Sequence, residues 1–235
     1  MCCFTGAGYH FALHLSSAEY WCYLDGMTQP SLAADPAVLY VGGDPALDLV
    51  NTVDWTSRGP EEERLRTYEQ VTRWAEGAGV LGPAIGRKLR RVGVEWPRAA
   101  AATVEYAHRA RETLQELFGA IARGESPGPA LARFNQLLAE AMGRLELAPG
   151  AGGCGDAGYE WRWKGQDSDP RAVVWPVIWS AADLLRSDEV RHVRVCDGDD
   201  CGWMYVDRSR NGFRRWCQMR TCGTREKTRR RRESP

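Results

Sequence analysis

Four cysteines near one end of the chain constrain the fold more than any other feature of the sequence. Four residues separate Cys196 from Cys201, four separate Cys217 from Cys222, and fifteen lie between the two pairs. Each pair therefore lies on a short arc that can bring both sulfur atoms to one ion. The spacing predicts four thiolates around one Zn²⁺. A disulfide pair and an iron–sulfur cluster are the alternatives.

A zinc ion with four thiolate ligands has no open position for an activated water, so we expect it to be structural rather than catalytic. Short metal-binding modules often need the ion to fold. We therefore expect chelation to unfold residues 188–232 and to spare the larger part of the chain. The remaining cysteines do not cluster in this way; they are Cys2, Cys3, Cys22 and Cys154.

Charge is distributed unevenly along a chain whose formal net charge is zero. Residues 208–232 contain ten Arg, one Lys and a single acid, Glu226, which gives this segment a net charge of +10 and leaves −10 for the rest. Such a concentrated basic end favours a polyanionic partner, with a solvated tail as the alternative. Arginine binds phosphate in a bidentate manner and also reads guanine, which suits DNA.

The predicted nucleic-acid contacts lie in a loop and in a helix that is expected to follow the second cysteine pair. Arg225, Arg229 and Arg232 are spaced to share one helix face, and Arg220 and Lys227 lie on a neighbouring stripe. The predicted contact set is Arg208, Arg210, Arg214, Arg215, Arg220, Arg225, Lys227, Arg229 and Arg230.

Residues near the cysteines support two further interpretations. We expect Asp207 or Asn211 to stabilise the turn in residues 207–212. Trp203 and Trp216 are expected to fill the small core of the module. The alternative, in which they stack on bases, would favour RNA or single strands as the partner.

Hydrophobic spacing predicts a mainly helical larger domain. We expect helices over residues 45–53, 68–78, 104–121 and 131–141, and another from about Trp175 to Leu185. Alternating residues in 145–147 and 159–163 predict a β-hairpin with an aromatic face, and short strands are expected at 38–41, 190–195 and 203–206.

These elements predict an α+β chain, with a mainly helical N-terminal domain that contains a small β-hairpin and a C-terminal module that resembles a treble clef. We place the larger domain at residues 37–187 and the module at 188–235. Residues 1–36 form an extension without clear periodicity, and we expect translation to begin at Met27.

The C-terminal run resembles a known family. Residues 201–212, continuing through Arg214–Cys217 to Cys222–Arg225, are similar to the CGNR zinc finger. In that family the finger follows a domain called ABATE, whose opening motif resembles residues 42–53. The resemblance covers residues 38–232 and implies a bacterial transcription regulator, often labelled stress-induced, whose finger binds duplex DNA. Thr224 stands where the family fingerprint has Asn, so the amide donor of that Asn is missing here.

The larger domain offers fewer chemical clues. Asp48 and Asn51 share a helix face and are interpreted as lining an effector pocket, or else as a hydrogen-bond network at the helix end. The expected role of the domain is effector sensing or dimerisation. No catalytic motif supports an enzyme, and an RNA-binding or ribosome-associated protein and an enzyme are the alternatives to a DNA-binding regulator. No run is apolar enough to span a membrane, so we expect a cytoplasmic protein.

Overall fold

A computed structural model describes residues 40–149 and 158–233. The predicted extension at 1–36, its start at Met27 and the first two residues of the predicted strand at 38–41 lie outside these residues. Tyr40 and Val41 are described and belong to no strand, so that prediction is wrong for these two residues. The physical reason is that the outer edge of the neighbouring strand is taken by Gly42, whose carbonyl accepts from the Val206 N–H at 2.8 Å.

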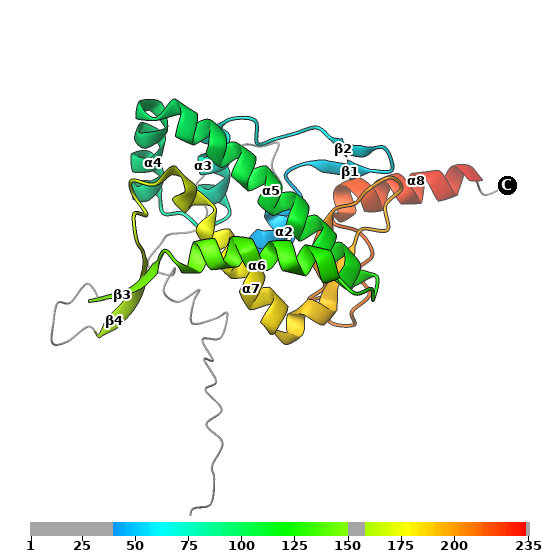
Figure 1. Cartoon of the computed structure of the whole chain (residues 1–235). Coiled ribbons are helices and arrows are strands. Elements are labelled where there is room, and N and C mark those ends of the chain that lie inside the picture. The colour runs from blue at the N-terminus through cyan, green and yellow to red at the C-terminus, as the bar shows by residue number, and fades with distance from the viewer. Residues whose placement is uncertain (1–39, 150–157, 234–235) are drawn as a thin grey trace, which may run out of the picture.

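Six helices form the body of the described chain (Figure 1). The longest, α5, carries a nearly continuous apolar face that is buried against the others; α6 packs along it, and α7 packs against α6 and α2. The helices are α2 (Pro45–Val50), α3 (Tyr68–Gly77), α4 (Pro83–Glu95), α5 (Pro97–Ala122), α6 (Gly128–Met142) and α7 (Trp175–Arg186). The predicted mainly helical domain is confirmed; α4 was not predicted, and α2 ends three residues early, at Val50.

Local sequence signals account for the starts of α2 and α3. The Asp44 carboxylate accepts a hydrogen bond from the Ala46 N–H at 2.8 Å, ahead of a proline in the first turn of α2. Thr67 and Gln70 form a reciprocal capping box at the start of α3. Both devices satisfy N–H groups that the first turn leaves without a helical partner.

Within residues 40–149 and 158–233, the strands form three antiparallel pairs: β1 (Asp54–Thr56) with β2 (Gly59–Glu61), β3 (Leu145–Pro149) with β4 (Tyr159–Trp163), and β5 (Val193–Val195) with β6 (Met204–Val206). The predicted β3–β4 hairpin is confirmed, and it projects from one end of the molecule (Figure 1). The predicted strand over 190–195 is shorter than expected, because Asp188–His192 forms a 3₁₀ helix.

The hydrophobic core extends from the larger domain into the cysteine-rich end. Val193, Met204 and Val206 are at most 2% exposed and belong to the same cluster as Leu47 and Phe118. A second, small cluster contains the four cysteines together with Trp203 and Tyr205. One face of the β5–β6 pair is thus part of the main core.

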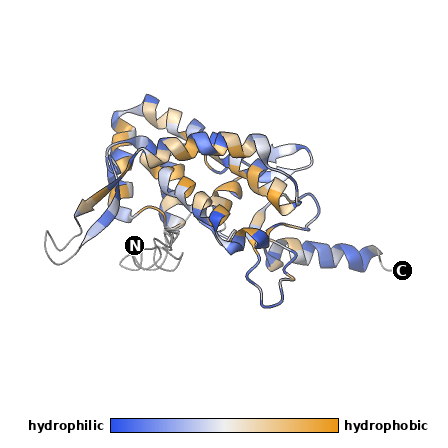
Figure 2. Cartoon of the chain, turned by 60° about the horizontal axis from the view of Figure 1, so that its bottom comes forward, coloured by the Kyte–Doolittle hydropathy of each residue, from blue (hydrophilic) through white to orange (hydrophobic). Residues whose placement is uncertain are grey.

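The chain ends in a polar helix, α8 (Thr224–Glu233), which follows a π-helical turn at Met219–Gly223. Figure 2 shows α8 as a hydrophilic rod that projects from the body, whereas the apolar residues gather on the helices of the body. None of the described helices is both long and apolar enough to cross a membrane.

Candidate metal centre and nucleic-acid interface

The structure brings the four predicted ligands together. The Sγ atoms of Cys196, Cys201, Cys217 and Cys222 all lie within 4.8 Å of one another. Cys201 Sγ lies 4.0 Å from Cys217 Sγ, which lies 3.6 Å from Cys222 Sγ. Four sulfur atoms at about 2.3 Å from one tetrahedral zinc ion would be separated by about 3.8 Å. The observed separations fit that geometry.

The same separations decide between the alternatives for the cysteines. A disulfide requires an S–S distance of about 2.05 Å, and all four cysteines are free thiols. An iron–sulfur cluster attaches its cysteines to different iron atoms and needs a wider shell than a single ion. The chemistry and spacing of the donors therefore match one Zn²⁺ held by four thiolates, with no further coordination position for water.

Backbone groups around the site stabilise thiolates. The N–H groups of Cys217 and Gly198 donate to Cys196 Sγ at 3.2 and 3.3 Å. Hydrogen bonds from Cys201 and Cys217, together with these N–H groups, hold the pKa of Cys196 far below its usual range. A Cβ atom at Gly198 would come within 3.0–3.1 Å of Cys222, so this position has room only for glycine without a shift of the ligand.

Asn51 connects the larger domain to the cysteine-rich module. Its Nδ2 donates to the Met204 carbonyl at 2.8 Å, and its Oδ1 accepts from the Met204 N–H at 2.8 Å. The amide is 2% exposed and pairs with β6 as another strand would. Both of its polar atoms are used in this way, as the hydrogen-bond network interpretation predicts for Asn51.

Further hydrogen bonds link the segment around α2 to β6 and the loop before it. Gly42 accepts from the Val206 N–H, and Trp55 accepts from the Gly202 N–H, both at 2.8 Å. The Trp203 indole N–H donates to the Val53 carbonyl at 3.0 Å. The outer edge of β6 is therefore covered by the predicted opening motif at 42–53, which removes an open strand edge from the surface.

Two acids in the segment 42–53, the buried Asp48 and the partly buried Asp44, have raised pKa values. Asp48 accepts from the Gly42 N–H at 2.8 Å, and burial raises its pKa to about 7 despite that bond. Burial likewise raises the pKa of Asp44 to about 6, against hydrogen bonds from Ala46 and the Ser180 hydroxyl. Asp48 thus orients the chain at Gly42, whereas Asn51 bonds to Met204, so the two side chains have different partners.

Three of the predicted nucleic-acid contacts are engaged inside the protein. Arg208 pairs with both carboxylate oxygens of Glu189, at 2.5 and 2.7 Å, and donates to the Gly43 carbonyl at 2.7 Å. Arg214 lies over the Tyr205 ring at 3.9 Å and donates to the carbonyls of Val41, Trp216 and Cys217.

Arg215, the third of these residues, pairs with Asp197 at 2.7 Å. Strand-like backbone pairing accompanies this contact, since the Asp197 N–H donates to the Arg215 carbonyl at 2.8 Å. The guanidinium group of Arg215 also lies 5.4 Å from the centre of the Trp216 ring. Arg208, Arg214 and Arg215 therefore help to hold the metal-binding loops in place.

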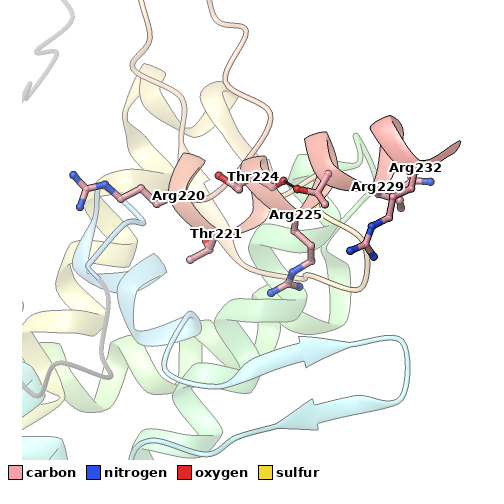
Figure 3. Close-up of a pocket in the computed structure, with 7 residues that line it drawn as sticks. Arg220, Thr221, Thr224, Arg225, Arg229 and Arg232 are labelled. Carbon is pink, nitrogen blue, oxygen red and sulfur yellow. Dashed lines mark hydrogen bonds between the residues drawn. The ribbon is translucent and has the colours of Figure 1, made fainter. Parts of the chain in front are cut away.

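The basic helix presents a continuous cationic face. Arg220, Arg225, Arg229 and Arg232, with the hydroxyl-bearing Thr221, Thr224 and Thr228 between them, line an open groove (Figure 3). Arg225, Arg229 and Arg232 share one face as predicted, whereas Arg220 joins them because the π-helical turn shifts its position. The sequence-based contact set omitted Arg232 and these threonines.

The remaining residues of the predicted contact set fall into two groups, those that bond Glu226 and those that bond no other described residue. Glu226 accepts from Arg229 and Arg230, and these hydrogen bonds lower its pKa to about 2. For Arg210, Arg220, Arg225 and Lys227 no hydrogen bond or ion pair with another described residue occurs. The Thr224 hydroxyl donates to the Met219 carbonyl at 3.0 Å, which stabilises the turn before α8.

The turn and the tryptophans follow the expected structural roles. The Asp207 carboxylate accepts from the N–H groups of Ser209 and Arg214 at 2.9 and 3.0 Å, so Asp207 stabilises the loop. Trp203 is 8% exposed and packs in the small cluster, against which the partly buried Trp216 also packs.

Two family models match the chain. Residues 43–188 match ABATE, described as "Putative stress-induced transcription regulator", and residues 192–234 match the CGNR zinc finger. A search of curated proteins found no match. The first match contains the helical body and the second contains the cysteine quartet and α8, so the matched order agrees with the resemblance found in the sequence. The chain therefore belongs to the ABATE family and carries a zinc-binding CGNR finger after its ABATE domain.

Proposed function

We propose that this protein is a cytoplasmic transcription regulator whose zinc finger binds duplex DNA through the exposed face of α8. The observation that carries the proposal is the row of Arg220, Arg225 and Arg232, whose charges no described acid neutralises. Ten residues of helix extend about 15 Å, and an α-helix fits the major groove of B-DNA. Arginine on such a face can bind phosphates and read guanine.

The metal serves this function as a structural part. Its four thiolates fix the turn that starts α8, Arg214 ties the adjoining loop to Val41, and Arg215 ties it to Asp197, next to the first ligand. Since the shell is closed, we assign the ion no catalytic step, and the proposed protein is a regulator rather than an enzyme. We leave Arg208, Arg214 and Arg215 out of the proposed contact surface because their guanidinium groups are already bonded.

Fluorescence anisotropy with a labelled duplex tests this proposal. We expect binding whose log affinity falls with log salt at a slope of about −3 to −5. Arg225→Gln should weaken binding and reduce the slope by about 1, with thermal stability unchanged because the side chain is exposed. Arg98→Gln on α5 is the matched control. Binding that does not respond to salt, or an Arg225→Gln variant with unaltered affinity, would contradict the proposal.

One observation favours the alternative of RNA or single-stranded nucleic acid. Phe213 is 80% exposed in the loop between the cysteine pairs, close in sequence to Arg210. Exposed aromatic rings stack on unpaired bases. Competition between duplex DNA, structured RNA and single strands at one salt concentration separates the two partners. Loss of single-strand binding in Phe213→Ala, with duplex binding retained, would assign Phe213 to this second role.

A further inference from the structure

The β3–β4 hairpin carries an apolar face that the described part of the chain leaves uncovered. Leu147 is 61% exposed, Tyr159 is 76% exposed and Trp161 is 44% exposed. Leu147 lies opposite Trp161 in the register, so the two side chains lie on the same side of the hairpin. Proteins usually cover such a combination of apolar side chains and strand edge, because it invites pairing with another chain.

The outer edge of β4 is open for hydrogen bonding. Within the described residues, β4 has β3 as its one neighbour. The Lys164 N–H donates to the Arg144 carbonyl at 2.6 Å, and bonded pairs alternate along an antiparallel ladder. The N–H and C=O groups of Tyr159 and Trp161 therefore point away from β3, toward the open edge.

The charges on β4 are arranged symmetrically about Trp161. Glu160 precedes this residue and Arg162 follows it. If two copies of β4 lie antiparallel with their Trp161 residues opposite each other, Glu160 of each copy faces Arg162 of the other. These contacts fall in the non-hydrogen-bonded pairs, where side chains approach most closely. Antiparallel pairing of two copies of β3 about Leu147 would place Glu146 opposite Ala148, which gives no charge pairing.

We propose that β4 is a homodimerisation edge, occupied by the same strand of a second copy of this chain. The pairing is antiparallel about Trp161 and produces a four-stranded sheet from two hairpins. Such a contact is isologous, as expected for a twofold dimer. It satisfies the outward-pointing groups of Tyr159 and Trp161 and brings the exposed apolar faces of the two hairpins side by side. The proposal does not depend on DNA binding.

Sedimentation velocity of the full zinc-loaded chain over a range of concentrations tests the dimer. Glu160→Arg places Arg opposite Arg at two symmetric contacts, and Arg162→Glu places Glu opposite Glu. Because like charges directly opposite each other are destabilising, each variant alone should raise the dimer dissociation constant by about tenfold or more. Glu105→Arg, an exposed charge reversal on α5, is the control and should leave it unchanged.

Mixing the two variants gives the decisive result. When a Glu160→Arg chain meets an Arg162→Glu chain, opposite charges face each other at both contacts. An equimolar mixture of the two single variants should therefore form heterodimers although neither variant self-associates. Loss of the contact between Arg162 and Glu160 within one chain (3.8 Å) would not be rescued by mixing. A monomer at every concentration, single variants that dimerise normally, or a mixture that stays monomeric would overturn the proposal.

Discussion

The two halves of the CGNR finger differ in what surrounds them. One face of β5 and β6 is buried in the core of the ABATE domain, where Met204 is 1% exposed, and Tyr205, also 1% exposed, is buried in the small cluster with the cysteines. In α8, by contrast, Glu226 is the one buried residue from Thr224 to Arg232. The first half therefore contributes to folding, and the second half leaves its charges available for a partner. The zinc ion links these halves, since Cys196 and Cys201 flank the strand side and Cys217 and Cys222 the helix side.

Removal of zinc should have the largest effect on the protein. An equal response of the buried strands and the exposed helix would contradict the difference between the two halves of the finger. Zinc binding contributes roughly 10–16 kcal/mol in finger peptides. Because β6 completes the main core, we expect chelation or Cys217→Ser to destabilise residues 42–53 as well as residues 193–223. This replaces the sequence-based expectation that the larger domain is spared. Hydrogen–deuterium exchange measures it, and unchanged protection of residues 42–53 would show that the domain folds independently of the finger.

Asn51→Ala should have the next largest effect on stability. It tests how much the buried strands of the finger contribute to folding. The substitution leaves the N–H and C=O groups of Met204 without partners in a buried site. Each unsatisfied group costs about 1–3 kcal/mol, so we expect the free energy of unfolding to fall by about 2–5 kcal/mol. Urea denaturation measures this loss. Asn211→Ala, an exposed change in the loop, is the control, and equal stability of the two variants would argue against the amide contact.

The pH dependence of stability should be the smallest effect. Asp48 has a pKa of about 7 in the folded protein and about 4 when unfolded, so the folded state holds a proton that the unfolded state has released. Its contribution is complete below pH 4 and is lost as the pH rises to 7, by about 2–4 kcal/mol. Asp44 acts in the same direction.

Asp48→Asn isolates this contribution, because asparagine does not titrate. The measurement is the slope of the free energy of unfolding against pH between 4 and 7, rather than its absolute value. We expect the slope of the variant to be more positive than that of the natural chain. Identical slopes would mean that burial does not raise the pKa of Asp48 in the folded protein.

The metal site could be predicted because its ligands lie on two short arcs and because four cysteines clustered in this way seldom have a role other than metal binding. The helices α3, α5 and α6 could be predicted because their regular apolar spacing is also a local sequence pattern. In α4 only Gly86 and Leu89 are buried, so its apolar face is too narrow to produce a clear periodicity. The strands β1 and β2 have three residues each, too few for an alternating pattern.

The roles of individual arginines could not be predicted, because their partners are distant in sequence. Arg214 donates to Val41, which lies 173 residues away, and Arg208 donates to Gly43, 165 residues away. A basic run specifies charge, but only the fold decides which guanidinium groups are already bonded. Asn51 illustrates the same limit: its spacing from Asp48 predicted a shared face, and its actual partner is 153 residues away.

The amide of Asn51 also restricts how such proteins can be recombined. A finger transferred to an unrelated host would expose the edge of β6 and the apolar side chains of Met204 and Val206, even with its zinc ion intact. A functional transplant must therefore carry residues 42–53 along with the finger, or supply an equivalent amide and carbonyl in the new host. In this chain, the smallest transferable unit combines segments from both family models.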